Sequence, residues 1–123
     1  MKKHTLHLGV LLALVMLLVT MSVPAFAETG DVEINETNFP DANFRAIVSF
    51  CDKDKSNTLS ATEIAAVKYL SCYNKKVKDL TGIEHFTALT TLQCDYNELT
   101  ALDISKNTAL TILTCVKNQL TVL

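Results

Sequence analysis

Leucines and a cysteine recur in the second half of the chain in a pattern that repeats every 21 residues. The stretch LTTLQCDYNEL, which begins at Leu89, returns as LTILTCVKNQL from Leu110. Of the 14 positions available in both copies, 8 are identical. The identical pairs include Leu92/Leu113, Cys94/Cys115, Asn97/Asn118 and Leu102/Leu123. So short a period is typical of solenoids, in which one repeat cannot bury its own apolar edge and must stack on its neighbours.

Each copy predicts one short strand followed by a bend. Leu92 and Cys94 alternate as the buried side of the strand, and Asn97 can turn its amide inward to satisfy backbone groups at the bend. The pattern L-x-x-L-x-C-x-x-N-x-L is the leucine-rich-repeat signature, with cysteine where the third leucine often stands. An earlier, degraded copy at a spacing of 22 has Lys75 in the asparagine position and keeps five apolar positions: Val67, Leu70, Cys72, Val77 and Leu80. The pattern therefore predicts a solenoid of parallel strands over residues 67–123, truncated at its C-terminal end.

Two short helices are predicted ahead of the repeats. In FPDANFRAIVSFC, apolar residues recur at helical spacing from Phe44 to Cys51, and Asp41 favours the positive end of the helix. A second helix, SATEIAAVKYL, opens with the capping-box pattern of Ser60 and Glu63. Residues 28–66 are therefore predicted to form a helical cap, and the fold class is α/β, a solenoid with this cap at its N-terminal end.

The twelve residues from Asp52 to Glu63 match the calcium loop of an EF-hand. The expected oxygen ligands are Asp52, Asp54, Ser56, the Thr58 carbonyl, Ser60 through water, and Glu63. Asn57 stands where glycine is usual, and asparagine tolerates the left-handed conformation of that turn better than most residues. We expect weak binding of Ca²⁺, in the range of ~0.1 to 1 mM typical of extracellular modules. A loop that only caps the second helix would explain Ser60 and Glu63, but not the alternating acidic and hydroxyl residues before them.

The N-terminus has the pattern of a secretory signal peptide. Lys2 and Lys3 precede an apolar core from Leu8 to Val19, and Ala25-Phe26-Ala27 is a small-x-small cleavage site. Residues 1–27 are therefore predicted to be removed, although an uncleaved anchor is the alternative. The apolar run is short for a bilayer and no second hydrophobic stretch follows it, so no membrane span is expected after cleavage.

The net charge of the mature chain limits the class of partner that it is expected to bind. Without Lys2 and Lys3, 9 basic residues remain against 13 acidic ones, a formal net charge of −4 on 96 residues. Nucleic-acid binding requires a basic face, so no nucleic-acid partner is expected. A chain of this length forms one small domain with a modest core.

The cysteine positions argue against a disulfide framework, although an exported chain would permit one. Cys72, Cys94 and Cys115 are equivalent positions of stacked strands, whose side chains point the same way ~4.8 Å apart. A disulfide requires converging β-carbons ~3.8 Å apart. We interpret these cysteines as buried thiols that act as small apolar residues, with a Cys51–Cys72 disulfide as an alternative.

The mature chain resembles the secreted leucine-rich-repeat proteins of intestinal and rumen bacteria, which are similar to internalins in plan. The resemblance lies in the order of its segments: INETNFPDANFR, the loop with LSATEI, VKDLTGIEHFTALTTLQC and LDISKNTALT. Such proteins carry a signal peptide, a helical cap and a parallel-strand solenoid used for adhesion or protein binding. The resemblance implies a calcium-loop cap at residues 52–63 and a ligand face on the strands of this chain.

The repeat register also indicates where such a face would lie. The residues that flank the buried leucine and cysteine should point to the concave side of the solenoid. They form three columns: Tyr69/Thr91/Ile112, Ser71/Gln93/Thr114 and Tyr73/Asp95/Val116. A flat, extended face suits a protein or glycan partner, and Tyr69 and Tyr73 are the strongest candidates because aromatic side chains dominate interface energetics. Ordinary solvated positions are the alternative.

No residue pattern indicates catalysis. The sequence has no nucleophile elbow, no glycine-rich phosphate loop and no cysteine with a plausible histidine partner. We therefore expect a non-catalytic adhesion or protein-binding module, secreted or at the cell surface, with calcium stiffening its cap. The alternative is a purely structural cap of a longer protein whose enzymatic or wall-anchoring function lies beyond Leu123.

Overall fold

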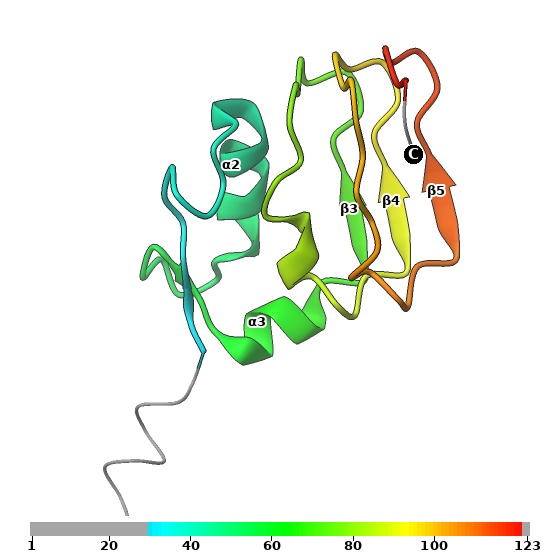
Figure 1. Cartoon of the computed structure of the whole chain (residues 1–123). Helices are drawn as coiled ribbons and strands as arrows, with labels where there is room; N and C mark the ends of the chain where they lie inside the picture. Colours follow the sequence, from blue (N-terminus) through cyan, green and yellow to red (C-terminus); the bar gives the residue numbers. More distant parts are fainter. Residues whose placement is uncertain (1–29, 122–123) are drawn as a thin grey trace, which may run out of the picture. The chain divides into compact units, whose positions relative to one another are not determined.

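Three short parallel strands follow the cap elements along the chain in the computed structural model, which describes residues 30–121 (Figure 1). In chain order the elements are β1 (Val32–Glu33), α2 (Ala42–Val48), the 3-10 helix η1 (Ser49–Cys51), β2 (Thr58–Leu59), α3 (Ala61–Ala66), β3 (Tyr69–Ser71), the 3-10 helix η2 (Ile83–His85), β4 (Thr91–Gln93) and β5 (Ile112–Thr114). The signal-peptide prediction for residues 1–27 lies outside the described residues. Within those residues, no helix has the length and apolarity to span a bilayer.

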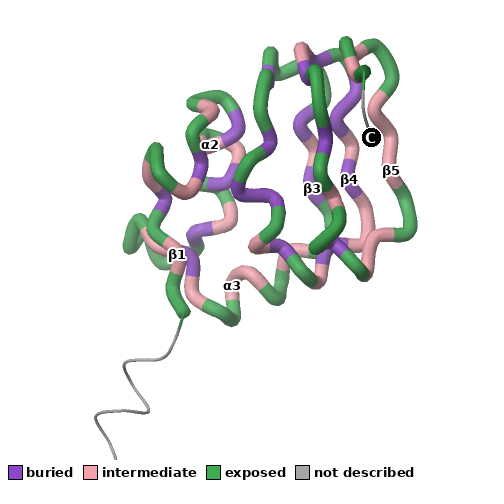
Figure 2. The backbone as a smooth tube through the Cα atoms, in the orientation of Figure 1, coloured by how far each residue is buried: buried purple, intermediate pink, exposed green. Residues whose placement is uncertain are grey.

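The three strands pair as the repeat spacing predicts. β3, β4 and β5 form one parallel sheet in that order. Leu70 pairs with Leu92, and Leu92 pairs with Leu113, so the predicted spacings of 22 and 21 residues are confirmed. Leu70 and Leu92 are buried and Leu113 is half-buried. In Figure 2 purple segments occur along β3 and β4, whereas β5 has none.

Asn97 satisfies the buried backbone at the bend after β4, as predicted. Its Oδ1 accepts from the backbone N–H groups of Lys75 and Val77, each at 3.0 Å. Its Nδ2 donates to three carbonyls, those of Cys72 (2.8 Å), Cys94 (2.9 Å) and Asp95 (3.2 Å). One buried amide therefore ties two consecutive turns of the solenoid together, and it uses most of the bonding capacity of the side chain.

The two predicted helices form, but the second is shorter than its sequence pattern suggests. Ser60 caps α3, and Ser60 and Glu63 complete a capping box, as expected. The helix ends at Ala66 because Val67 is already extended, with φ −82° and ψ 101°. The following residues leave the helical pattern because Tyr69 begins strand β3, where pairing with β4 satisfies the backbone. Tertiary pairing thus overrides local helical periodicity at this point.

The carboxylate of Asp41 joins the cap to the first repeat. Its Oδ1 accepts from the N–H groups of Asn43 and Phe44 (both 2.9 Å) and so caps α2. Its Oδ2 accepts from the N–H groups of Lys78 (2.8 Å) and Asp79 (3.2 Å), which follow β3. The Asp41 carboxylate therefore accepts from four backbone N–H groups, two in the cap and two in the repeats, and so positions the cap against the repeats. The sequence did not predict this contact.

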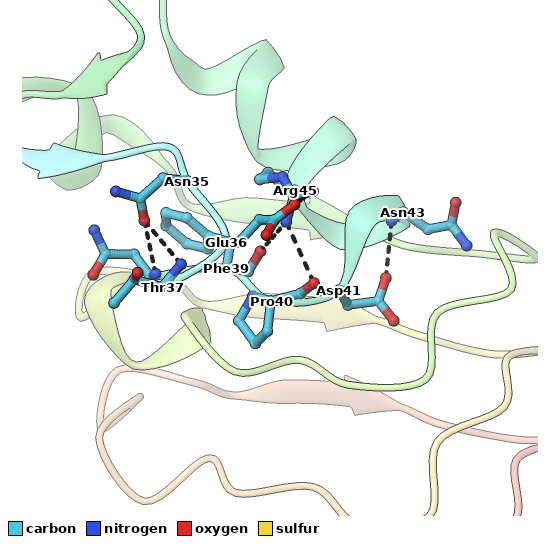
Figure 3. Close-up of polar contacts among 9 residues, drawn as sticks. Asn35, Glu36, Thr37, Phe39, Pro40, Asp41, Asn43 and Arg45 are labelled. Atoms are coloured by element: carbon cyan, nitrogen blue, oxygen red, sulfur yellow. Dashed lines mark hydrogen bonds and ion pairs between the residues drawn. The ribbon is translucent and has the colours of Figure 1, made fainter.

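The turn that leads into α2 is held by hydrogen bonds from one side chain before it, Asn35, and one after it, Arg45 (Figure 3). Asn35 Oδ1 accepts from the N–H group of Thr37 at 3.1 Å. Arg45 Nη1 donates to the carbonyls of Phe39 (2.6 Å) and Pro40 (3.3 Å). These contacts fix Phe39, which is fully buried and lies edge-on to Phe44 with ring centroids 6.1 Å apart.

One hydrophobic core runs from the cap into the repeats. Its buried members are Ile34, Phe39, Phe44, Val48, Leu59, Leu70, Cys72, Val77, Leu80, Ile83, Phe86, Leu89, Leu92, Cys94, Leu99 and Leu102. Gly82 lies at the junction with φ +106°, and a β-carbon there would overlap the Phe39 ring. A glycine is therefore required at this position, both for the backbone conformation and for space.

Replacing Asn97 by alanine should lower the free energy of unfolding by about 3 kcal/mol, because it leaves buried N–H and carbonyl groups without partners. The matched control is Asn118→Ala in the next turn. Asn118 makes the same kind of bonds to Cys94, Cys115 and Leu99 but is half-buried, so water can replace its amide and the expected loss is about 1 kcal/mol. Urea unfolding followed by circular dichroism measures both values, and equal losses would contradict this account of the bend.

Candidate functional site

The predicted calcium ligands converge in the loop between η1 and α3. Asp52, Asp54 and Glu63 each offer a carboxylate oxygen, and the three oxygens lie within 4.8 Å of one another. Asp52 is buried, whereas Asp54 and Glu63 are more accessible. Asn57 has φ +65°, the left-handed conformation that the turn requires of it. The folded loop therefore gathers hard oxygen ligands of the kind that Ca²⁺ prefers.

Backbone donors organise these carboxylates. Asp52 accepts from the N–H groups of Ser56 (3.1 Å) and Asn57 (2.8 Å), and Asp54 accepts from Ser56 at 3.0 Å. Hydrogen bonds from Ser56 lower the pKa of the Asp54 carboxyl group. The Ser60 N–H group, followed by that of Lys53, lowers the pKa of Glu63. Both carboxylates consequently stay ionised to a lower pH than usual.

The residues that follow Asp54 in the predicted ligand series have internal partners as well. Ser56 Oγ lies 3.2 Å from the Thr58 carbonyl and 2.9 Å from Thr58 Oγ1. Ser60 Oγ donates to Glu63 Oε2 at 2.9 Å and accepts from the Glu63 N–H group. Glu63 Oε1 accepts from the Lys53 N–H group at 2.6 Å. Helix capping and convergence of the carboxylates therefore coexist, and they do not exclude one another.

Strand β1 pairs with the strand inside this loop. Val32 pairs with Leu59, and Glu33 pairs with Thr58, in antiparallel register. The Ile34 N–H group donates to the Asn57 carbonyl at 3.1 Å, and Leu59 is fully buried. The residues before the first helix therefore provide the pairing partner of the loop.

The predicted face on the strands is assembled by the parallel register. We define the outward strand face as Tyr69, Ser71, Thr91, Gln93, Ile112 and Thr114. Tyr69 is 59% exposed and Ile112 is 54% exposed. Gln93 Oε1 accepts from Tyr69 Oη at 3.0 Å and from Ser71 Oγ at 3.1 Å. The glutamine thereby positions the side chains of the neighbouring strand.

The third predicted column is arranged differently from the other two. Asp95 is only 8% exposed, and its carboxylate accepts from Thr114 Oγ1 (2.7 Å) and from the Val116 N–H group (2.6 Å). Tyr73 contacts Tyr96, with ring centroids 5.4 Å apart. Asp95 therefore links two consecutive repeats by hydrogen bonds. No pattern in the sequence identified Tyr96 as part of a binding surface, because its position in the repeat belongs to the bend and not to the strand.

All four cysteines are free thiols, so the alternative Cys51–Cys72 disulfide is not present in the structure. Burial raises the pKa of Cys72 and of Cys94 to about 12 in each case. Cys94 Sγ donates to the Thr114 carbonyl at 3.2 Å. A thiol with so high a pKa is neutral at physiological pH, which fits the role of a small core residue.

Comparison with known proteins places the fold. No protein-family model matches the chain. Over 71 residues the chain is 44% identical to Internalin J of Listeria monocytogenes serotype 4b (strain F2365), a stretch that is 57% of this chain and 8% of the relative. The chain thus spans less than a tenth of the length of this relative.

Solved structures agree with the sequence comparison. The functional domain of InlJ from Listeria monocytogenes, described as including a cysteine ladder, superposes with a TM-score of 0.63 and 35% identity, over 76% of this chain and 23% of that one. An internalin, inlF, from strain 4b F2365 superposes with a TM-score of 0.63 and 26% identity, over 74% and 27% of the two chains. The fold is therefore of the leucine-rich-repeat type, and the chain is similar to bacterial internalins.

Alkylation should distinguish the cysteines by burial. We expect iodoacetamide at about pH 8 to label Cys51 and Cys115, which are half-buried, well before Cys72 and Cys94. Mass spectrometry of peptides taken over time measures the order, and labelling in urea, where all four should react alike, is the control. If Cys94 reacted as fast as Cys115, the interpretation of the cysteines as an inert part of the core would be wrong.

Proposed function

We propose that the chain is a non-catalytic, secreted or cell-surface binding module whose outward strand face contacts a protein partner. The observation that supports this most directly is the in-register face itself, in which exposed Tyr69 and Ile112 lie beside half-buried amide and hydroxyl residues on three parallel strands. Short stacked strands offer a flat surface and not an enclosed pocket, which suits a macromolecular partner. Similarity to internalins adds support at the level of the class.

A protein suits this face better than a glycan does. Tyr69 and Ile112 combine aromatic and aliphatic area with little charge, and the six residues of the face include no Lys, Arg, Asp or Glu. Depletion of charged residues together with enrichment in tyrosine is typical of the centre of protein interfaces. Gln93, which is already held by Tyr69 and Ser71, leaves its Nε2 group free to donate to a partner.

The double variant Tyr69→Ala/Gln93→Ala should lower binding of the labelled protein to cultured cells or immobilised matrix by about tenfold or more, because it removes the exposed aromatic contact and its amide neighbour. The matched control is Asp103→Ala/Lys106→Ala, which changes two exposed residues in the connection between β4 and β5. Circular dichroism verifies that both variants fold. Equal binding by the two double variants would refute the strand face as the binding surface.

We further propose that the loop from Asp52 to Glu63 binds Ca²⁺ and stiffens the cap. Asp52, Asp54, Ser56 and Glu63 would supply side-chain oxygens, Thr58 its carbonyl, and Ser60 a water-mediated contact. The convergence of three carboxylates supports this assignment, because a divalent cation would offset their mutual repulsion. The capping box is compatible with it, since Glu63 already points one oxygen toward the start of the loop.

Calorimetric titration should detect Ca²⁺ binding with a dissociation constant of ~0.1 to 1 mM, and Glu63→Gln should weaken it by about tenfold or more. Glutamine keeps the capping-box geometry but removes the charge, so the variant separates the two roles of Glu63. Mg²⁺ is the matched control ion and should bind more weakly, because it requires a tighter octahedral shell. Wild-type protein that gives no binding heat with millimolar Ca²⁺ would disprove the site.

A further inference from the structure

The turns that follow β3, β4 and β5 stack on one another and repeat one backbone conformation. The Asn74 N–H group donates to the Asp95 carbonyl at 3.0 Å, and the Tyr96 N–H group donates to the Val116 carbonyl at 2.8 Å. Each turn has a left-handed residue at the equivalent position: Asn74 (φ +53°), Tyr96 (φ +58°) and Lys117 (φ +59°). The side chains at this position therefore project from consecutive turns of the solenoid.

Tyr96 is not required at this position by the fold. A left-handed conformation is tolerated by asparagine, which occupies it in the preceding repeat, and is unfavourable for a bulky side chain. The tyrosine gains little burial in return, since it is 49% exposed. Its ring instead contacts Tyr73, which is 47% exposed, with the ring planes at 57°. The two rings thus form an accessible aromatic pair beyond the ends of the strands.

Unpaired positive charge surrounds the same turns. Lys75, Lys76 and Lys117 are exposed, and none of them makes an ion pair within residues 30–121. The nearby Lys78 differs, because it is paired with Glu98 at 3.7 Å. Asp95 is buried, and its carboxylate accepts from Thr114 Oγ1 and from the Val116 N–H group. Three exposed lysines therefore gather at this edge of a chain whose formal net charge is −2. We name these five residues, Tyr73, Tyr96, Lys75, Lys76 and Lys117, the aromatic rim.

We propose that the aromatic rim binds an acidic polysaccharide, a chain of sugars that carry carboxylates. The C–H groups of a pyranose ring carry partial positive charge and pack against the negative face of an aromatic ring. Tyr73 and Tyr96, whose ring centroids lie 5.4 Å apart, offer accessible aromatic surface against which a sugar ring can pack. The lysine ammonium groups then pair with the sugar carboxylates as point charges.

Other polyanions fit this edge less well. Lysine is depleted at protein interfaces, so a rim in which three of five residues are lysine is atypical of a protein-binding surface. Proteins that bind single-stranded nucleic acid also combine aromatic stacking with positive charge, but they use a groove that tracks the phosphates. The rim is also separate from the outward strand face, because it shares no residue with it. The two proposals can therefore fail independently.

The test is titration of the purified protein with oligogalacturonate, which carries one carboxylate on every sugar, in low salt and EDTA so that the loop at Asp52 plays no part. Fluorescence of the tyrosines or calorimetry reports binding. The key variant is Tyr96→Asn, which places in this turn the residue that Asn74 already provides in the preceding one. The fold should be unperturbed, and the affinity should fall by about tenfold or more.

Further ligands and variants decide the proposal. Fully methyl-esterified oligogalacturonate, which has the same rings without charge, should bind at least about tenfold more weakly. The triple variant Lys75→Gln/Lys76→Gln/Lys117→Gln should abolish the salt dependence of binding. Tyr69→Ala, on the strand face, should bind like the wild type. The proposal is overturned if Tyr96→Asn binds normally, if the ester binds equally well, or if poly-L-glutamate or oligothymidylate binds as tightly as oligogalacturonate.

Discussion

The asparagine amide at the bends after β4 and β5 is the interaction on which the rest of the structure depends. A solenoid turns its backbone inward once per repeat, and each inward N–H and carbonyl group requires a partner there. Asn97 provides five such bonds from one side chain, and Asn118 repeats the arrangement in the next turn. Because these bonds join successive turns, they hold neighbouring strands in register. The register in turn places every exposed column.

The cap is attached to this array by polar and apolar contacts that act at different points. Asp41 bonds to the backbone after β3, while Phe39 fills the space beside Gly82. The core continues from Ile34 through Leu102 without a break. Stiffening of the calcium loop would consequently act on the same folded unit that presents the strand face, although the loop and the face consist of different residues.

The strand face and the aromatic rim differ in chemistry because they occupy different parts of the repeat. Successive side chains of a strand point to opposite faces, so the residues on the outward face of neighbouring strands form flat columns. Bend positions project from the ends of the strands, where long side chains remain solvated and charge is tolerated. This division explains why uncharged Tyr69 and Gln93 share one surface, while Tyr96 lies near unpaired lysines.

The sequence by itself determined the parallel register, the inward amide, the capping box and the convergence of Asp52, Asp54 and Glu63 within one loop. Each of these follows from local spacing, since equivalent repeat positions must meet the same core and a twelve-residue loop turns its alternate side chains inward. Only the tertiary structure decided that α3 stops at Ala66, that Asp41 reaches Lys78, that Asp95 bonds to Thr114 and that Tyr96 meets Tyr73. These contacts join residues from different turns or elements, whose separation in space no local pattern encodes.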